Sequence, residues 1–169
     1  MQNIHIQQRP FLTRPENLQG VSPFVATLLA RRGVQSEQEL DLKLKYLLAP
    51  NMKGLVEAIE IIDQAIDESK KIVIVGDYDA DGATSTTLMI LALREMGANV
   101  QYLVPDRFKY GYGLTPAIAD LAFTTYTPDL LITVDNGISS HAGVEQAQAH
   151  GMKVVITDHH LTTKETPKA

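Results

Sequence analysis

Four short apolar runs rich in β-branched residues alternate with helical segments from residue 71 onward, and this alternation most constrains the fold. The first run, KIVIV, is apolar at almost every position, which is typical of a strand buried on both faces of a sheet. Strands that alternate with helices favour a mostly parallel sheet flanked by helices. The sequence therefore predicts an α/β domain over residues 54–169. Its strands are expected at residues 71–75, 100–104, 130–134 and 153–157.

Helices are expected before and between these strands. Apolar residues recur every three or four positions across residues 54–69, which predicts an amphipathic helix. The other helices are predicted at residues 83–96, 116–122 and 139–150.

Residues 1–53 are predicted to form a separate N-terminal lead that is partly extended and partly helical. Ser22 and Pro23 suit the cap and first turn of a helix that stops at Gly33. Residues 36–39 have the pattern of a capping box that opens a second short helix.

The composition limits what such a chain can bind. It contains no cysteine, which excludes disulfides and thiolate metal sites. It has no run of about 18 apolar residues and no signal-peptide pattern, so we expect a cytoplasmic location without membrane contact. The net charge of −5 argues mildly against a grip on nucleic-acid phosphates, although bound divalent cations would reverse the local charge.

Acidic residues and histidines follow the predicted strands. In an open parallel sheet, ligands bind outside the carboxyl ends of the strands, so these residues should converge on one edge. Residues 76–82 (GDYDADG) follow the first strand, and residues 105–107 (PDR) and 111–113 (GYG) follow the second. Residues 135–137 (DNG) follow the third strand, and residues 158–160 (DHH) follow the fourth.

This pattern indicates a metal site. The carboxylates of Asp77, Asp79 and Asp81 would repel one another unless a cation lay among them. Oxygen ligands together with one or two imidazoles suit Mn²⁺ or Mg²⁺ better than a thiol-binding metal. Two such ions roughly 3.5–4 Å apart could generate a hydroxide and stabilise a leaving oxygen in phosphoryl chemistry.

Other polar residues receive structural interpretations. A lone aspartate at a strand end is more often a cap or turn residue, which we predict for Asp106 and Asp129. The single histidines His141 and His150 are also predicted to be structural. The loop at residues 111–113 is either a flexible turn or a contact to substrate.

Two other chemistries compete for the acidic segment. It begins like an EF-hand loop, but the twelfth position is Leu88 and a strand precedes it, so calcium binding is rejected. It also approaches the signature of haloacid-dehalogenase-type phosphatases, in which Asp79 would attack phosphorus and Asp81 would act as acid–base. That alternative leaves the paired histidines without a role. Neither a dinucleotide-binding glycine motif nor a Walker loop is present.

The longer motifs resemble the DHH phosphoesterase family. The DHH tripeptide is similar to the motif that names the family, and residues 77–81 are similar to its first motif. The resemblance is strongest to its single-strand-specific exonucleases and covers about residues 20–165. It is carried by VGDYDADGATST (75–86), YLVPDRFKYGYGL (102–114), ITVDNGISSHAGVE (132–145) and VITDHHL (155–161).

The resemblance implies a Mn²⁺- or Mg²⁺-dependent exonuclease that removes nucleotides from the 5′ end of single-stranded DNA in recombination and repair. It implies a metal pair with Asp135 as the bridging ligand. The implied ligands are Asp79, Asp81, Asp135 and His159.

The resemblance also implies roles around the metal pair. His160 would stabilise charge on the scissile phosphate, Asp158 would orient an adjacent histidine, and Asp77 is the first acid of its motif. The segment with Arg107, Tyr112 and Gly113 would lie near the substrate, where the arginine could pair with a phosphate. The implied partners are single-stranded DNA, a single-strand-binding protein and a RecQ-type helicase.

The family also supplies a further aspartate ligand, a DHHA1-type domain and an oligonucleotide-binding domain after the DHH motif. This chain ends at Ala169, so we expect weak or no exonuclease activity from it alone. The alternatives within the family are an oligonucleotide phosphatase or a pyrophosphatase. A purely binding role is a third possibility, against which the intact acids and histidines argue.

Overall fold

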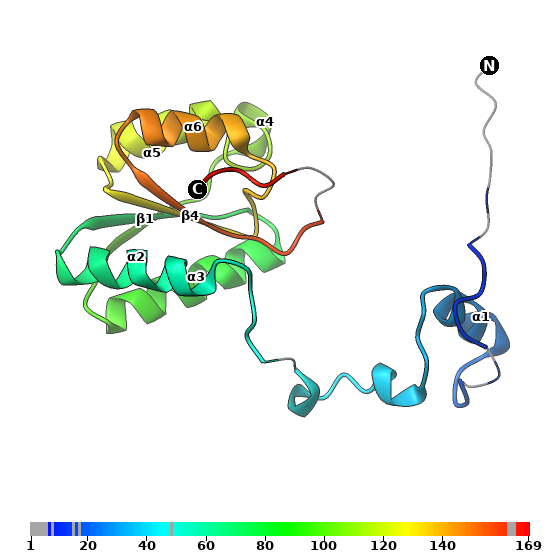
Figure 1. Ribbon diagram of the computed structural model, residues 1–169. Coiled ribbons are helices and arrows are strands. Elements are labelled where there is room, and N and C mark those ends of the chain that lie inside the picture. The colour runs from blue at the N-terminus through cyan, green and yellow to red at the C-terminus, as the bar shows by residue number, and fades with distance from the viewer. Residues whose placement is uncertain (1–6, 8, 15, 17, 48, 162–164) are drawn as a thin grey trace, which may run out of the picture. The chain divides into compact units, whose positions relative to one another are not determined.

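The computed structural model of the protein describes residues 7, 9–14, 16, 18–47, 49–161 and 165–169. The chain divides into two compact units, residues 1–52 and residues 53–169, each of which is described by itself (Figure 1). Among the described helices, none has both the length and the apolar character that crossing a membrane requires.

The first unit contains the predicted helix, α1 (Pro23–Arg31), in which Ser22 Oγ accepts a hydrogen bond from the backbone N–H of Val25. The predicted capping box is wrong. Ser36 makes no side-chain cap bond, and the Glu39 carboxylate instead accepts from the backbone N–H of Gln35 at 3.0 Å. The segments after α1 are the short 3₁₀ helices η2 (Glu37–Leu40) and η3 (Leu44–Tyr46).

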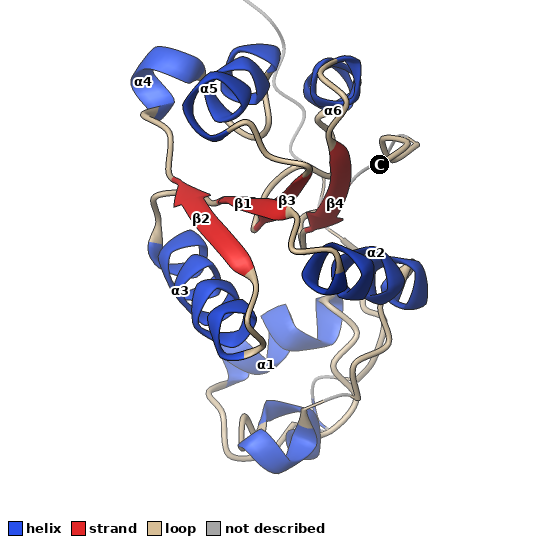
Figure 2. Ribbon diagram, turned by 90° about the vertical axis from the view of Figure 1, so that its left-hand side faces the viewer, coloured by secondary structure: helices blue, strands red, loops and turns tan. Residues whose placement is uncertain are grey.

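The second unit is built on a four-stranded parallel sheet with the order β2-β1-β3-β4, which confirms the predicted fold class (Figures 1 and 2). Three strands have the predicted bounds, and β2 begins one residue earlier than expected. The strands are β1 (Lys71–Val75), β2 (Asn99–Leu103), β3 (Leu130–Val134) and β4 (Lys153–Thr157).

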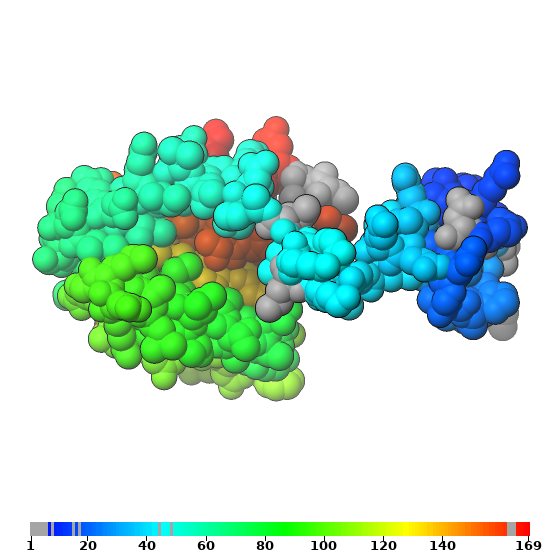
Figure 3. All heavy atoms as spheres, turned by 90° about the horizontal axis from the view of Figure 1, so that it is seen from below, coloured from blue at the N-terminus to red at the C-terminus, as the bar shows by residue number. Residues whose placement is uncertain are grey.

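Helices cover both faces of this sheet (Figures 1 and 2). One face carries α2 (Leu55–Asp67) and α3 (Ala80–Glu95). Figure 3 shows the atoms of these two helices, with atoms of β3 and β4 visible between them. The other face carries α5 and α6, with the short helix α4 on the same side. Their bounds are Arg107–Tyr110 for α4, Pro116–Tyr126 for α5 and His141–Ala149 for α6.

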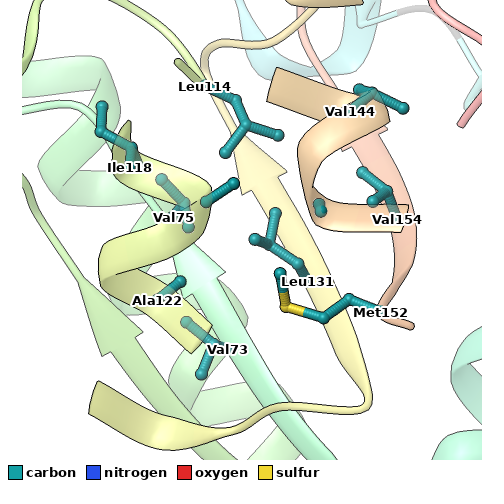
Figure 4. Close-up of a cluster of buried hydrophobic side chains, with 11 residues drawn as sticks. Val73, Val75, Leu114, Ile118, Ala122, Leu131, Val144, Met152 and Val154 are labelled. Carbon is teal, nitrogen blue, oxygen red and sulfur yellow. The ribbon is translucent and has the colours of Figure 1, made fainter. Parts of the chain in front are cut away.

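Alternate strand residues supply the two halves of the core. Val73, Val75 and Leu131 pack against α5 and α6 (Figure 4). Ile72 and Ile74 point to the opposite face, where they join the side chains of α2 and α3. Because both faces are covered, the strands read as continuous apolar runs rather than as alternating ones.

Close packing of α6 on the segment before α5 explains why residue 143 is glycine. A Cβ atom at Gly143 would overlap the carbonyl oxygen of Leu114. A larger residue there would push α6 away from the sheet, and with it the loop that joins β3 to α6.

The strand order places the topological switch point between β1 and β3. The chain leaves β1 for β2 on one side and returns to β3 on the other, so the connections after β1 and β3 diverge. In open α/β sheets such a switch point is where ligands bind. The buried amide of Asn136 bridges the two strand ends, since its Nδ2 donates to the carbonyls of Val75 and Val134 at 3.1 and 2.9 Å.

Candidate active site

Asp135 lies at the centre of the site, directly after β3. Its side chain is 6% exposed, and its φ of 62° is in the left-handed region, which few non-glycine residues adopt. Its backbone N–H donates to the carbonyl of Thr157 at 3.0 Å, which holds it at the edge of the sheet. Burial raises the pKa of the Asp135 carboxyl, and the negative charge of Asp79 raises it further. A nearby cation would relieve both effects.

The two histidines of the DHH motif supply nitrogen ligands beside Asp135. His159 Nε2 lies 2.9 Å from Asp135 Oδ1, and the rings of His159 and His160 lie 4.6 Å apart. Within the described residues, ligand atoms of Asp135, His159 and His160 all lie within 4.8 Å of one another. One carboxylate and two imidazoles at this spacing suit a divalent transition metal such as Mn²⁺.

Asp158 is buried under His160 and holds it in place. Its side chain is 3% exposed, and Oδ1 accepts from the backbone N–H of His160 at 3.0 Å and lies 2.7 Å from His160 Nδ1. The other oxygen accepts from the backbone N–H of Ile138 at 2.9 Å. Burial acts to raise the pKa of Asp158, but these hydrogen bonds outweigh it and lower the pKa. Asp158 therefore remains a fixed anion, and the pKa of His160 is raised mainly by it.

Asp79 and Asp81 lie at the start of α3, and both are exposed. Asp79 is the N-cap, and its Oδ1 accepts from the backbone N–H of Gly82 at 3.0 Å, which lowers the pKa of its carboxyl. Among the described residues, the compact ligand group contains His160 and neither of these two acids. The arrangement thus differs from the expected ligand set, because His160 lies as close to Asp135 as a ligand would.

Asp77 pairs with Arg107 at one side of the site. Asp77 Oδ2 lies 2.6 Å from Arg107 Nη2, and Asp77 Oδ1 accepts from the backbone N–H of Tyr78. This carboxylate raises the pKa of the arginine. The guanidinium also contacts two tyrosine rings, with its Cζ 4.2 Å from the centre of Tyr78 and 4.9 Å from that of Tyr112. The predicted phosphate-pairing arginine is therefore placed at the site, with one terminal nitrogen engaged by Asp77.

The loop at residues 111–113 reaches the histidines. Tyr112 Oη lies 3.5 Å from His160 Nε2, and the two rings meet edge to face. Gly113 has a φ of 74°, and a Cβ there would lie 3.0 Å from Ser140 Oγ. That hydroxyl accepts from the backbone N–H of Leu114, so the loop is tied to the start of α6.

Three of the residues predicted to be structural make structural contacts. Asp106 caps α4, and Asp129 accepts from the backbone N–H of Lys71 at 2.9 Å, so both predictions are confirmed. His150 lies 2.6 Å from Asp120 and stacks on the ring of Phe123 between α5 and α6.

Two residues of the site were not predicted from the sequence. Asn136 received no role within the segment at residues 135–137, yet it joins β1 to β3 from a position that is 2% exposed. Tyr78 received no role, although it lies between two acids and contacts Arg107. The signal for both was their place beside an aspartate directly after a strand.

Curated relatives share most of this chain. It is 52% identical over 144 residues to the single-stranded-DNA-specific exonuclease RecJ of Dickeya dadantii, covering 84% of this chain and 25% of that protein. It is 49% identical over 149 residues to RecJ of Escherichia coli, covering 87% of this chain and 26% of that protein. The chain thus spans about a quarter of the length of these relatives.

A solved structure shares the fold. The crystal structure of exonuclease RecJ bound to manganese matches with a TM-score of 0.65 and 37% identity, over 72% of this chain and 31% of that one. The family described as "DHH family, N-terminal domain" matches residues 71–169, more than half of the chain. These residues include the whole sheet and every group of the site, and the chain therefore belongs to the DHH family.

Proposed function

We propose that this chain carries the catalytic centre of a metal-dependent exonuclease that hydrolyses phosphodiester bonds of single-stranded DNA from the 5′ end. The observation that carries the proposal is the group formed by Asp135, His159 and His160, with ligand atoms within 4.8 Å at the switch point of the sheet. The substrate class is supported by the relatives, which are named single-stranded-DNA-specific exonucleases.

The donor set fits Mn²⁺ or Mg²⁺. Asp135 is nearly buried beside the charge of Asp79, and a carboxylate in this position is stabilised by a cation. We propose that Asp135 and His159 would hold metal together with Asp79 and Asp81 at the start of α3. Divalent ions held there would lower the pKa of bound water and neutralise charge on the oxygens of a phosphate.

The chain's own residues orient the phosphate. With Nδ1 directed at Asp158, the other nitrogen of His160 faces Tyr112 and is available to donate to a phosphate oxygen. Asp77 is proposed as a positioning residue, because its contact at 2.6 Å fixes the guanidinium of Arg107. Gly113 lets the loop carry Tyr112 over the histidines.

A phosphoenzyme formed on Asp79 is less well supported. This residue caps α3 through Gly82, and the histidines gather at Asp135 rather than around it.

The setting of the reaction is also proposed. We expect a cytoplasmic protein that acts in recombination and repair. From the family resemblance we add a single-strand-binding protein and a RecQ-type helicase as partners.

The test is hydrolysis of single-stranded DNA labelled at either end, by the folded chain with Mn²⁺. We expect slow release of nucleotides from the 5′ end, with none in EDTA or from the Asp81→Ala variant. A duplex of the same sequence should resist. Release from the 3′ end, or equal activity of the Asp81→Ala variant, would contradict the proposal.

A further inference from the structure

A pocket of about 290 Å³ lies beside the acidic site and has no role in holding metal. It is formed at the junction of β2 and α4, with one wall from the turn after β1. Its lining residues are Tyr78, Val104, Pro105, Asp106, Arg107 and Phe108.

The rings at this pocket face solvent. Phe108 is 97% exposed and Tyr78 is 52% exposed. Single exposed apolar residues are common on protein surfaces, but here two rings and a guanidinium line one hollow. Aromatic rings interleaved with a cation are typical of surfaces on which bases of single strands stack.

Two polar groups of the pocket are already engaged. The Asp106 carboxylate accepts from the backbone N–H of Phe108 at 2.9 Å, and Arg107 Nη2 pairs with Asp77 at 2.6 Å. Most of the remaining lining consists of ring faces and apolar walls, which do not read the edge of a particular base. Stacking of this kind tolerates any base, because every base has a π-face.

An unbroken row of contacts joins the pocket to the histidines. The guanidinium of Arg107 lies against Tyr78 and Tyr112, and Tyr112 Oη lies 3.5 Å from His160 Nε2. A strand with one phosphate at His160 would pass Tyr112 and Arg107. A nucleotide of the same strand would then reach the pocket.

The net charge makes stacking the more important source of affinity. A net charge of −5 argues mildly against the many phosphate contacts by which basic proteins hold nucleic acid. We infer that the pocket lined by Tyr78 and Phe108 binds, by stacking, a nucleobase of the single strand whose phosphate lies at the metal site. This inference rests on the proposed function.

The test compares binding of two oligonucleotides by fluorescence anisotropy in Mn²⁺. One is a thymidine oligomer, and the other has the same backbone with abasic sugars. Both carry phosphorothioate links, so that neither strand is consumed. The variants are Phe108→Ala, Phe108→Leu and Phe108→Trp, and Leu88→Ala is the control because Leu88 is 70% exposed on α3. Since Phe108 is almost fully exposed, these substitutions should not affect folding.

We expect Phe108→Ala and Phe108→Leu to weaken binding of the thymidine oligomer about 5- to 100-fold, the range for loss of one base–aromatic stack. Phe108→Trp should retain binding, and Leu88→Ala should not change it. Binding of the abasic strand should be the same for all variants.

Equal weakening on both strands, full retention by Phe108→Leu, or no preference of the unaltered chain for the base-bearing strand would overturn the inference. Base-dependent binding together with hydrolysis of ordinary DNA from the 3′ end, or with equal hydrolysis by Asp81→Ala, would instead sink the proposed function and leave the stacking site standing.

Discussion

Asp135 and Asp158 are both nearly buried, yet their pKa values shift in opposite directions. Asp158 accepts from two backbone N–H groups and from His160, and these bonds stabilise its charge. Asp135 contacts His159 and faces the charge of Asp79. The charge of Asp158 is thus stabilised by hydrogen bonds within the protein, whereas the carboxylate of Asp135 is suited to bind a cation.

The contact between Asp158 and His160 should make the stability of the fold depend on pH. Because the pKa of His160 is raised on folding, the charged imidazole contributes to the free energy of unfolding. This contribution is complete below about pH 6.5 and is lost as pH rises through the folded-state pKa of His160. Because the pKa of Asp158 is lowered on folding, the contribution of its carboxylate is complete above about pH 3.9 and is lost as pH falls through its folded-state pKa. Asp158→Asn should therefore destabilise the metal-free chain most between about pH 4 and 6.5.

NMR titration without metal checks this pair directly. The pKa of His160 should fall toward its ordinary value in Asp158→Asn. An unchanged His160 pKa in the variant would show that Asp158 does not hold the imidazole.

At this scale the sequence predicted which polar residues lie together at the sheet edge, but not the contacts between them. The aspartates and histidines could be placed because each follows a strand. The contact between Asp77 and Arg107 joins residues 30 positions apart through the side-by-side ends of β1 and β2. That contact depends on the order of the strands in the sheet, which the pattern of apolar residues does not predict.

The start of α3 combines a structural and a chemical role in one residue. Asp79 caps the helix through Gly82 and lies near enough to Asp135 to affect its pKa. A capping residue needs only a side-chain oxygen that accepts from the helix, whereas a metal ligand of this kind needs a carboxylate.

Two substitutions separate these roles. Asp79→Ser should keep the cap and the unfolding temperature but weaken Mn²⁺ binding. Asp79→Ala should lose both the helix cap and the metal ligand, and its thermal unfolding midpoint should be lower by about 2–4 °C. Thermal unfolding of the metal-free variants, together with Mn²⁺ titration, distinguishes the two. Equal Mn²⁺ binding by Asp79→Ser and the unaltered chain would remove Asp79 from the ligand set.

Element boundaries were predictable where the apolar pattern was strong. The strands at residues 71–75, 130–134 and 153–157 were confirmed without change. The helix predicted from residue 83 begins at Ala80, since the acidic motif forms its cap and first turn rather than a loop. The four-residue helix α4 was missed, because an element this short has no periodicity to detect.

At the scale of the whole second unit, the parallel sheet explains why residues 77, 107, 135 and 160 can form one site. Strand ends deliver all of them to the same edge, and the strand order opens that edge between β1 and β3. The amide of Asn136 closes the gap below the site by joining both strands. A divalent metal held at this edge would add positive charge where the acidic residues gather.

The most direct test is to measure Mn²⁺ binding to the folded chain. Binding is monitored as the loss of the electron paramagnetic resonance signal of free Mn²⁺. Asp135→Asn should weaken binding by at least about tenfold. Asp120→Asn should bind as the unaltered chain does, because Asp120 pairs with His150 away from the site. Equal affinity of the Asp135→Asn variant and the unaltered chain would contradict the account.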